Sequence, residues 1–342
     1  MKKYLLPKTG NFYKANLHCH TTCSDGKKSP EEVKALYKKL GYSIVAYTDH
    51  DIFLPHDDLN DDTFLALHGF EMEINEDSPI RERRKTCHIC FIGLEKKNLI
   101  QPLWHRSKYL FGNAPTYREK IKFDDTLPDY ERVYSGEKIT EIMQTAREKG
   151  FFVTYNHPTW SLEDYRDYMG YSGMHAMEIF NGSCNASGYI EYNARVYDDI
   201  LKGGNMIYCI GADDNHNAKP DFTRRSDSGW AFTVIKAKNL KYRTVTRALE
   251  LGEFYASEGP EIYELYYENG EVYIKCSGAD KICCTYDIRS AQAVMSENDI
   301  PVTEARFKIN DKAGWFRITI TDAKGRHACT NAYLLDSLKT EC

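Results

Sequence analysis

Features that mark several common protein classes are missing from this sequence. It contains no long run of apolar residues, so no membrane-spanning helix is predicted. The opening segment, residues 1–7, is too short and too soon interrupted by proline to act as a signal peptide. The formal net charge of −5 argues against a generally basic, nucleic-acid-binding surface. We therefore expect a cytoplasmic protein with no membrane partner, for which a nucleic-acid partner is disfavoured.

Several catalytic and structural motifs are missing as well. The chain has neither the G-x-S-x-G motif of serine hydrolases nor a glycine-rich phosphate loop. Cys87 and Cys90 form a C-x-x-C pair, but the second pair that a zinc knuckle requires is not present. The eleven cysteines are scattered, which is typical of free thiols in a reducing compartment. Chemistry based on a nucleophilic side chain is thus not predicted.

The order of elements predicts an α/β region followed by an all-β region. Up to about residue 258, short β-like runs alternate with helical ones, such as the helix that the capping sequence Ser29-Pro-Glu-Glu32 begins. This order favours a mostly parallel sheet closed into a barrel over residues 1–258. After Pro260, short alternating strands and turns predict a small antiparallel β domain without helices, over residues 259–342.

Residues 95–137 interrupt this pattern. The stretch fits no clean period and is rich in aromatic and basic side chains, including Trp104, His105, Tyr109 and Phe111. An insertion of this length inside a compact domain is usually functional or disordered, and its aromatic content argues against disorder. We interpret it as a lid over the site; the alternative is an ordinary peripheral pair of helices.

Histidines recur where predicted strands end. His18 and His20 are two residues apart, so they point the same way if the strand that begins at Phe12 continues to them. Six of the eleven histidines end or lie on a predicted strand: His18, His20, His50, His88, His157 and His216. In parallel barrels the C-terminal strand ends meet at one face, where chemistry takes place. Asp25, Glu71 and Asp214 supply the carboxylates that a cluster of cations needs, and Asn181 and Asp227 are candidates to support the ligands.

Two of these assignments are ambiguous from the residues alone. Glu71 and Glu73 lie on the same strand face, so alternation does not choose between them. Asp213 and Asp214 lie on opposite faces, and only Asp214 shares a face with His216. Asp214 is therefore the favoured ligand, with Asp213 as the alternative.

These motifs resemble those of the polymerase and histidinol phosphatase (PHP) family of metal-dependent phosphoesterases. The matching pieces run in family order over residues 12–235: His18-Cys-His20, Ser24-Asp25-Gly26, Thr48-Asp-His50, Gly69-Phe-Glu71, His88 before an apolar run ending in Gly93, Asn156-His157-Pro158 and Asp214-Asn-His216. The resemblance implies a distorted (β/α)7 barrel that binds up to three metal ions. The region after Pro260 lies outside the resemblance, although some bacterial members similar to this chain carry such a domain.

The resemblance also implies a ligand set. His18 and His20 would hold one ion together with Glu71 and Asp214. Glu71, which the family's Gly-x-Glu pattern favours over Glu73, would bridge to a second ion held by His88 and His157. Asp25, His50 and His216 would hold the third. Glu71, Asp214 and His216 would then be the catalytic residues.

This ligand set predicts hydrolysis by metal-activated hydroxide. A bound transition metal lowers the pKa of water from about 15.7 towards 7, and paired ions stabilise an in-line phosphoryl displacement. Mixed nitrogen and oxygen ligands suit zinc, manganese or iron better than magnesium or calcium. A cationic clamp for the phosphate is also expected. The candidates, in order, are Arg224 and Arg225; then Arg81, Arg83, Arg84 and Lys85; then Arg106, Lys108 and Arg118.

The sequence therefore favours an enzyme that hydrolyses a small phosphomonoester such as a nucleotide, a sugar phosphate or histidinol phosphate. The first alternative is a 3'-5' exonuclease or phosphodiesterase that acts on nucleic-acid ends with the same metals. The second is an amidohydrolase that attacks a C–N bond. A binding module without activity is disfavoured because every ligand position is occupied. The sequence is compatible with an oligomer and does not predict one.

Overall fold

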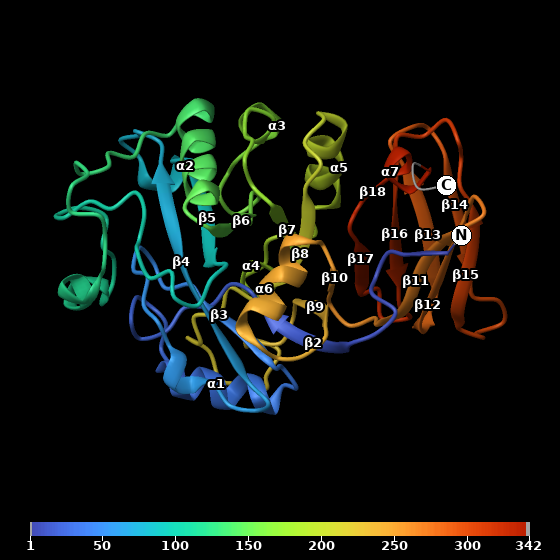
Figure 1. The fold of residues 1–342 in the computed structure, drawn as a ribbon, viewed down its shortest axis with the longest axis horizontal. Helices are drawn as coiled ribbons and strands as arrows, with labels where there is room; N and C mark the ends of the chain where they lie inside the picture. Colours follow the sequence, from blue (N-terminus) through green and yellow to red (C-terminus); the bar gives the residue numbers. More distant parts are fainter. Residues whose placement is uncertain (1, 340–342) are drawn as a thin grey trace.

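The computed structural model describes residues 2–339 and has a mixed α/β fold with two sheets (Figure 1). Met1 and residues 340–342, at the outer ends of the two predicted domains, lie outside the described residues. The smaller sheet is antiparallel, with the order β1 (Lys3–Tyr4), β11 (Ile262–Glu268), β12 (Glu271–Ala279) and β15 (Val302–Lys308). The start of the chain thus packs into the C-terminal region.

The larger sheet runs through both predicted domains. Its order is β14 (Ala291–Met295), β13 (Lys281–Tyr286), β16 (Trp315–Thr321), β17 (His327–Thr330), β10 (Phe254–Ser257), β9 (Phe232–Ala237), β2 (Asn11–Asn16), β3 (Ile44–Tyr47), β4 (Leu65–Asn75), β5 (Thr86–Gly93), β6 (Phe151–Asn156), β7 (Ala176–Asn181) and β8 (Tyr208–Ala212), and β18 (Tyr333–Leu334) pairs with β16. β10 pairs with β17, so hydrogen bonds cross the predicted boundary after residue 258. The boundary itself stays a prediction.

Strand directions in the α/β region are mixed. β2, β3 and β4 are parallel, as are β6, β7 and β8, but β5 is antiparallel to both of its neighbours. Only residues 76–85 join β4 and β5, and this connection is too short for the crossover that a parallel pair needs. The two strands therefore form a long antiparallel hairpin. The expectation of a mostly parallel sheet is therefore only partly met.

The predicted barrel is not confirmed, because the strand order of the described residues does not form a ring. The two ends of the α/β region nevertheless meet. Just beyond β2 and β8, Cys19 and Asn215 form an isolated parallel bridge, and the Asp214 amide donates to the His18 carbonyl over 3.0 Å. This contact sets His18 and His20 beside Asp214.

The helices lie outside the sheets, and Figure 1 shows α2, α3 and α5 on one side of the α/β region and α1 at its far end. The helices are α1 (Pro30–Lys39), α2 (Gly136–Glu148), α3 (Tyr165–Tyr168), α4 (Gly182–Ala186), α5 (Ala194–Lys202), α6 (Tyr242–Glu250) and α7 (Leu335–Lys339), with 3-10 turns η1 (Asp57–Leu59), η2 (Arg81–Arg83) and η3 (Ala114–Lys120). The predicted helix start and cap at Ser29 are confirmed, and the structure shows that Ser29 and Glu32 form a capping box. The expectation of a helix-free C-terminal region is wrong, since α7 lies there.

Residues 95–135 follow a largely irregular path with one 3-10 turn, and residues 136–137 begin α2, so the segment is not a pair of helices. Two contacts tie the segment to the site. Arg132 forms an ion pair of 2.6 Å with Asp51, and both side chains are buried. The Asn113 amide donates to the Ser24 carbonyl over 2.7 Å. The segment therefore borders the loops that carry Asp25 and His50; its role as a lid stays a prediction.

Candidate metal centre

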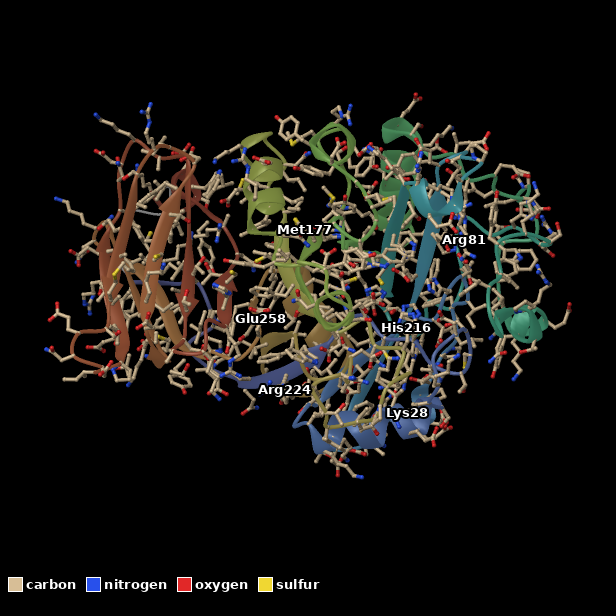
Figure 2. The ribbon with its side chains drawn as sticks, turned by 180° about the vertical axis from the view of Figure 1, so that it is seen from behind. Lys28, Arg81, Met177, His216, Arg224 and Glu258 are labelled. Carbon is tan, nitrogen blue, oxygen red and sulfur yellow. The ribbon has the colours of Figure 1, made fainter. Side chains whose placement is uncertain are left out.

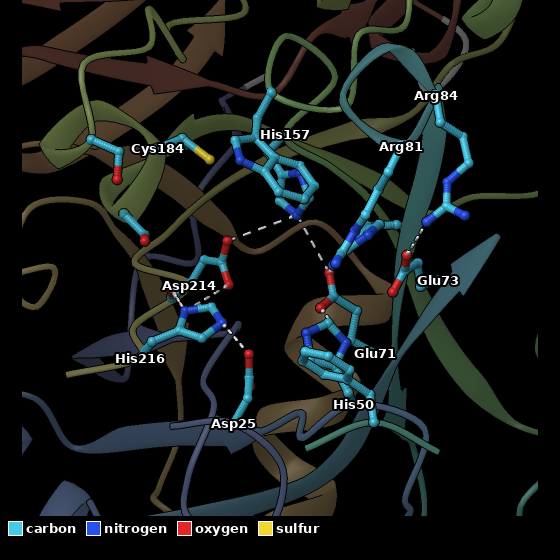
Figure 3. Close-up of a pocket in the computed structure, with 15 residues that line it drawn as sticks. Asp25, His50, Glu71, Glu73, Arg81, Arg84, His157, Cys184, Asp214 and His216 are labelled. Carbon is cyan, nitrogen blue, oxygen red and sulfur yellow. Dashed lines mark hydrogen bonds and ion pairs between the residues drawn. The ribbon is translucent and has the colours of Figure 1, made fainter. Parts of the chain in front are cut away.

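Seven of the nine predicted ligands line one pocket of 380 Å³ (Figure 3), and the other two, His18 and His20, contact Glu71 and Asp214 of that pocket. Asp25 and four of the six histidines follow β2, β3 or β6 in sequence, Glu71 and His88 lie within the hairpin β4–β5, and Asp214 and His216 follow β8. The strand β2 ends at Asn16, earlier than predicted. His18 and His20 keep the same orientation because the extended chain continues to the bridge at Cys19.

Glu71 lies at the centre of the cluster, and its two oxygens face different histidines. Its Oε1 lies 3.1 Å from His18 Nε2, 3.0 Å from His88 Nδ1 and 3.4 Å from His157 Nε2. Its Oε2 lies 3.3 Å from both His20 Nε2 and His50 Nδ1. A carboxylate whose two oxygens point to separate groups of imidazoles has the arrangement of a bridging ligand. Glu73, the alternative on the same strand face, lines the pocket further out, 4.0 Å from Arg84.

Asp214 occupies the other side of the same histidines. Its Oδ1 lies 3.2 Å from His18 Nε2 and 3.1 Å from His20 Nε2, and its Oδ2 lies 3.8 Å from His157 Nε2. Its backbone has a φ of 53°, a left-handed conformation that is uncommon outside glycine. Strain of this kind is tolerated where the surroundings fix a side chain for function.

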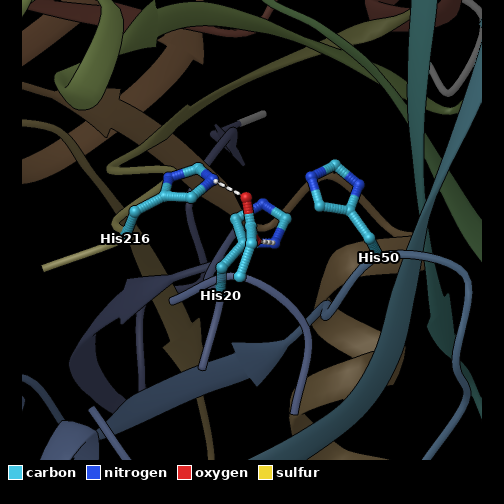
Figure 4. Close-up of side chains that lie close together, drawn as sticks. His20, His50 and His216 are labelled. Carbon is cyan, nitrogen blue, oxygen red and sulfur yellow. Dashed lines mark ion pairs between the residues drawn. The ribbon is translucent and has the colours of Figure 1, made fainter. Parts of the chain in front are cut away.

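A third group of possible metal ligands lies beside the groups around Glu71 and Asp214. His20, Asp25, His50 and His216 offer ligand atoms that all lie within 4.8 Å of one another. His216 Nε2 lies 3.3 Å from Asp25 Oδ2. The ring of His20 stacks between the other two imidazoles, 4.4 Å from His50 and 4.3 Å from His216 between ring centroids (Figure 4).

These residues fit divalent cations. Three buried imidazole nitrogens, His20 Nδ1, His50 Nδ1 and His88 Nε2, have no hydrogen-bond partner within the described residues. An unpaired buried polar atom costs about 1–3 kcal/mol, and a bound ion would remove that cost by coordination. The Nε2 atoms of His18 and His20 lie 3.1 Å apart, a distance at which two lone pairs repel unless a proton or a cation lies between them. The donor set of imidazoles and carboxylates suits transition metals.

The electrostatic environment points the same way. Burial opposes charge, but the imidazoles of His18, His88 and His50 hold the pKa of Glu71 well below its usual value. Burial likewise disfavours charged imidazoles, yet Asp214 and Glu71 raise the pKa of His18 and His20 well above the usual range. Burial and the neighbouring His20 lower the pKa of His50 to about 3, so that its ring is neutral. The pocket therefore attracts positive charge, and it offers a neutral ligand at His50.

Sequence reasoning missed Glu178, which joins three of the ligand positions. It lies on β7 with no exposed surface, and its Oε1 accepts a hydrogen bond of 2.7 Å from His18 Nδ1. Its Oε2 accepts from the His157 backbone amide at 3.1 Å and from Asn181 Nδ2 at 2.9 Å. Asn181 Nδ2 also lies 3.3 Å from Asp214 Oδ2. The only sequence signal was a carboxylate within an otherwise apolar strand.

Three further aspartates, Asp213, Asp49 and Asp227, bind backbone groups of the surrounding loops and do not line the pocket. Asp213, the alternative to Asp214, accepts hydrogen bonds from the amides of residues 229–231 and from Tyr37. Asp49 accepts from the backbone and hydroxyl groups of Thr21 and Ser24. Asp227 accepts from the His216 amide at 2.8 Å. These carboxylates fix the ligand-bearing loops.

Cys90 also lies close to the cluster, and its thiol, His18 and Glu71 place ligand atoms within 4.8 Å of one another. Burial raises the pKa of the Cys90 and Cys87 thiols, so the thiolate that binds metal is disfavoured. Both thiols are fully buried, as expected for small apolar residues.

The predicted phosphate clamps fall in different places. Arg84 lines the pocket, and so does Arg81, which Figure 3 shows directed into it towards Glu71. Arg224 and Arg225 are exposed and are not among the lining residues, and Figure 2 shows Arg224 at the periphery. Arg118 binds the Arg106 backbone carbonyl. Arg106 and Lys108 form ion pairs with Asp129 and Glu131.

Comparisons with known proteins give structural neighbours only. No family model matches the chain, and no curated protein matches it. Within residues 2–339 no helix is long and apolar enough to cross a bilayer. A two-domain protein from Bacteroides vulgatus that contains a predicted PHP-like metal-dependent phosphoesterase is 15% identical, with 97% of each chain covered and a TM-score of 0.46.

Two shorter neighbours have lower scores. A candidate metal-dependent phosphoesterase from Bifidobacterium adolescentis is 15% identical over 63% of this chain and 91% of its own, with a TM-score of 0.38. An amidohydrolase from Chromobacterium violaceum, with bound sulfate and no metal, is 14% identical over 59% of this chain and 87% of its own, with a TM-score of 0.38. All three neighbours have TM-scores below 0.5 and are at most 15% identical to this chain.

Proposed function

We propose that this protein is a metal-dependent hydrolase of phosphate esters and that its substrate is a small phosphomonoester. The observation that carries the proposal is the convergence of six imidazoles and three carboxylates that line one pocket or contact its carboxylates, with an arginine directed into the same pocket. One proposed ion site consists of His18, His20, Glu71 and Asp214, a second of Glu71, His88 and His157, and a third of Asp25, His50 and His216. Zinc, manganese or iron suits these ligands. Divalent ions bound there supply Lewis acidity and lower the pKa of water towards neutrality.

The side chains of the pocket have separable roles in this reaction. Glu71 and Asp214 hold positive charge beneath the phosphoryl group, because both carboxylates face several imidazoles and their charge is retained. His216 is 29% exposed at the pocket wall, and its Nδ1–H donates to the Asp214 backbone carbonyl over 3.0 Å. That bond leaves the free lone pair of the ring on Nε2, which faces Asp25 and the pocket. This lone pair is thus the donor that His216 would offer to an ion of the third group, and the Nδ1–H bond fixes the ring in the orientation that this requires.

Arg81 is the proposed phosphate clamp. It lines the pocket, and its guanidinium forms no hydrogen bond or ion pair with any of the residues that the structure describes. Arginine's planar fork matches two phosphoryl oxygens, so an unpaired guanidinium above a metal centre is well suited to bind them. Arg84 is a weaker candidate because it lies 4.0 Å from Glu73.

A substrate panel tests the proposal. The purified protein, loaded separately with manganese, iron and zinc, is assayed on phosphomonoesters, on a phosphodiester, on a single-stranded oligonucleotide and on N-acyl amino acids. We expect phosphate release from monoesters. Shortening of the oligonucleotide would favour the exonuclease alternative, and amide cleavage without phosphate release would favour an amidohydrolase. Absence of any hydrolysis by protein that retains its metal would contradict the proposal.

A pair of arginine variants tests the clamp. We expect Arg81→Ala to raise KM for the monoester by about 10- to 100-fold, as loss of a charge-assisted pair predicts, with little change in metal content. Arg224→Ala removes an exposed arginine outside the lining residues and tests the competing sequence prediction. A larger KM effect in Arg224→Ala than in Arg81→Ala would show that the loop of residues 217–228 binds the phosphate instead.

A further inference from the structure

Two large aromatic side chains at the pocket remain substantially exposed. Phe111 is 45% exposed and Trp160 is 39% exposed, and both line the same pocket as the metal ligands. Each packs edge-to-face on ligand imidazoles. The Trp160 ring lies 5.3 Å from His88 and 5.1 Å from His157, and the Phe111 ring lies 5.7 Å from His50. Two apolar rings thus stand directly over the polar floor.

Hydrogen bonds and close packing fix the backbone segments that carry both rings. The Trp160 amide donates to Glu191 Oε1 over 2.6 Å, and the adjacent Thr159 hydroxyl donates to Asn193 over 3.1 Å. After Phe111, Gly112 has a φ of 57° and lies so close to the chain that an added Cβ would be 2.4 Å from the Ser24 carbonyl oxygen. Exposed rings on fixed backbones are preorganised surfaces, which lose little freedom when a ligand covers them.

The size of the pocket leaves room beside a phosphate. Its volume of 380 Å³ is within the range of pockets that enclose whole small molecules, of about 300–1,000 Å³. A phosphate on the floor, held by Arg81, would fill only part of it. The remaining space is bordered by Phe111 and Trp160 and by the serines of the α4 segment, Ser183 and Ser187. The leaving group must therefore occupy a space whose main apolar surfaces are two aromatic rings.

We propose that Trp160 and Phe111 bind a flat aromatic ring on the leaving group, so that the enzyme selects ring-bearing phosphomonoesters over phosphorylated sugars. This inference rests on the proposed function, because it concerns the leaving group of that reaction. A base that stacks on an aromatic side chain gains roughly 5- to 150-fold in affinity, and the gain tolerates any base because each has a π face. Trp160 is the principal surface, since its indole is the larger ring and contacts two ligand histidines.

The test compares adenosine 5'-monophosphate with ribose 5-phosphate. Both substrates present a phosphate ester of a primary 5'-hydroxyl, and hydrolysis of either breaks one P–O bond and releases phosphate and an alcohol. They differ chiefly in the aromatic ring. In the metal-loaded wild type we expect kcat/KM to be at least about 10-fold higher for the nucleotide. Trp160→Ala should bring the ratio close to one by lowering only the nucleotide value, Phe111→Ala should lower the ratio less, and Trp160→Phe should retain most of it.

The controls separate this inference from the proposed function. Tyr263→Ala removes an equally exposed aromatic residue from the C-terminal region and should leave the ratio unchanged. Equal kcat/KM for both substrates in the wild type, or an equal loss for both in Trp160→Ala, would overturn the inference while leaving a phosphatase. If neither ester is hydrolysed, the proposed function fails. Adenosine titration followed by tryptophan fluorescence then decides the ring site independently, since quenching that Trp160→Phe abolishes supports it and absence of quenching overturns it.

Discussion

Two buried carboxylates in the α/β region have opposite surroundings. Glu71 is 1% exposed and faces five imidazoles, whereas Glu163 is 8% exposed and accepts hydrogen bonds from Tyr134, Tyr155 and Tyr171. Histidines hold the pKa of Glu71 well below its usual value in spite of burial. Burial raises the pKa of Glu163 to about 7, because the tyrosine hydroxyls only partly compensate for lost water.

The comparison shows that burial alone does not make a functional carboxylate. Groups that can carry or share positive charge keep Glu71 ionised, and the same arrangement suits the binding of cations. Neutral hydroxyls surround Glu163 and give it a structural role. The two are nonetheless connected, since Glu163 closes the loop that begins at His157, and its amide donates to the Pro158 carbonyl over 3.1 Å. One carboxylate forms the site, and the other fixes the loop that carries His157 and Trp160.

The largest effect is expected at Glu71. Glu71→Gln keeps the shape of the side chain but removes the charge shared by five imidazoles, so bound metal should fall by at least one equivalent. Hydrolysis should fall by on the order of 1,000-fold, since ions held there would lower the pKa of the attacking water. Metal content by mass spectrometry and kcat/KM measure both changes, and circular dichroism checks the fold.

Glu73→Gln is the matched control for this change. Glu73 lies on the same strand face two residues further along and lines the outer pocket. It faces none of the ligand histidines within ion-pair distance among the described residues, so its variant should keep the wild-type metal content. Loss of metal in Glu73→Gln together with full content in Glu71→Gln would mean that the other carboxylate of the pair is the ligand.

An intermediate effect is expected at Glu178, which contacts ligands from the far side. Glu178→Gln should weaken the hydrogen bond that fixes His18 with its Nε2 lone pair towards the pocket, and supporting residues of this kind typically contribute 10- to 100-fold to metal affinity. Competition with a chromogenic chelator measures the dissociation constant. Unchanged affinity with reduced activity would instead assign Glu178 a role in the reaction.

The difference between Glu71 and Glu178 also shows which parts of the site could be predicted. Ligands at strand ends are visible in sequence because histidines and acids recur there with a spacing of two. Glu178 occupies an inward position in the middle of an apolar strand, and nothing in its neighbours indicates that His18, 160 residues away, would lie 2.7 Å from it. The sequence offered several basic candidates for the phosphate clamp and did not single out Arg81, because only the fold of the β4–β5 hairpin brings Arg81 into the pocket.

The fold shows a similar limit. Alternation of strands and helices predicted the α/β region and the antiparallel C-terminal sheets correctly in kind. It did not predict that β5 reverses direction, because strand direction depends on how a connection is routed and not on strand composition. Nor did it predict that β10 pairs with β17, because pairing between strands 70 residues apart leaves no local pattern.

The smallest effect on activity, and a distinct effect on stability, is expected at Glu163. An acid whose folded-state pKa is raised stabilises the protein fully below its unfolded-state pKa of about 4.5, and this contribution is lost as pH rises through about 7. Glu163→Gln stays neutral throughout, so relative to wild type it should gain on the order of 2–3 kcal/mol between pH 5 and pH 8. Urea unfolding of both proteins with chelator at the two pH values measures this difference, while kcat/KM should stay within about threefold because no metal ligand is changed. Parallel pH dependence in the two proteins would show that Glu163 is ionised when folded, and the contrast with Glu71 would then rest on geometry alone.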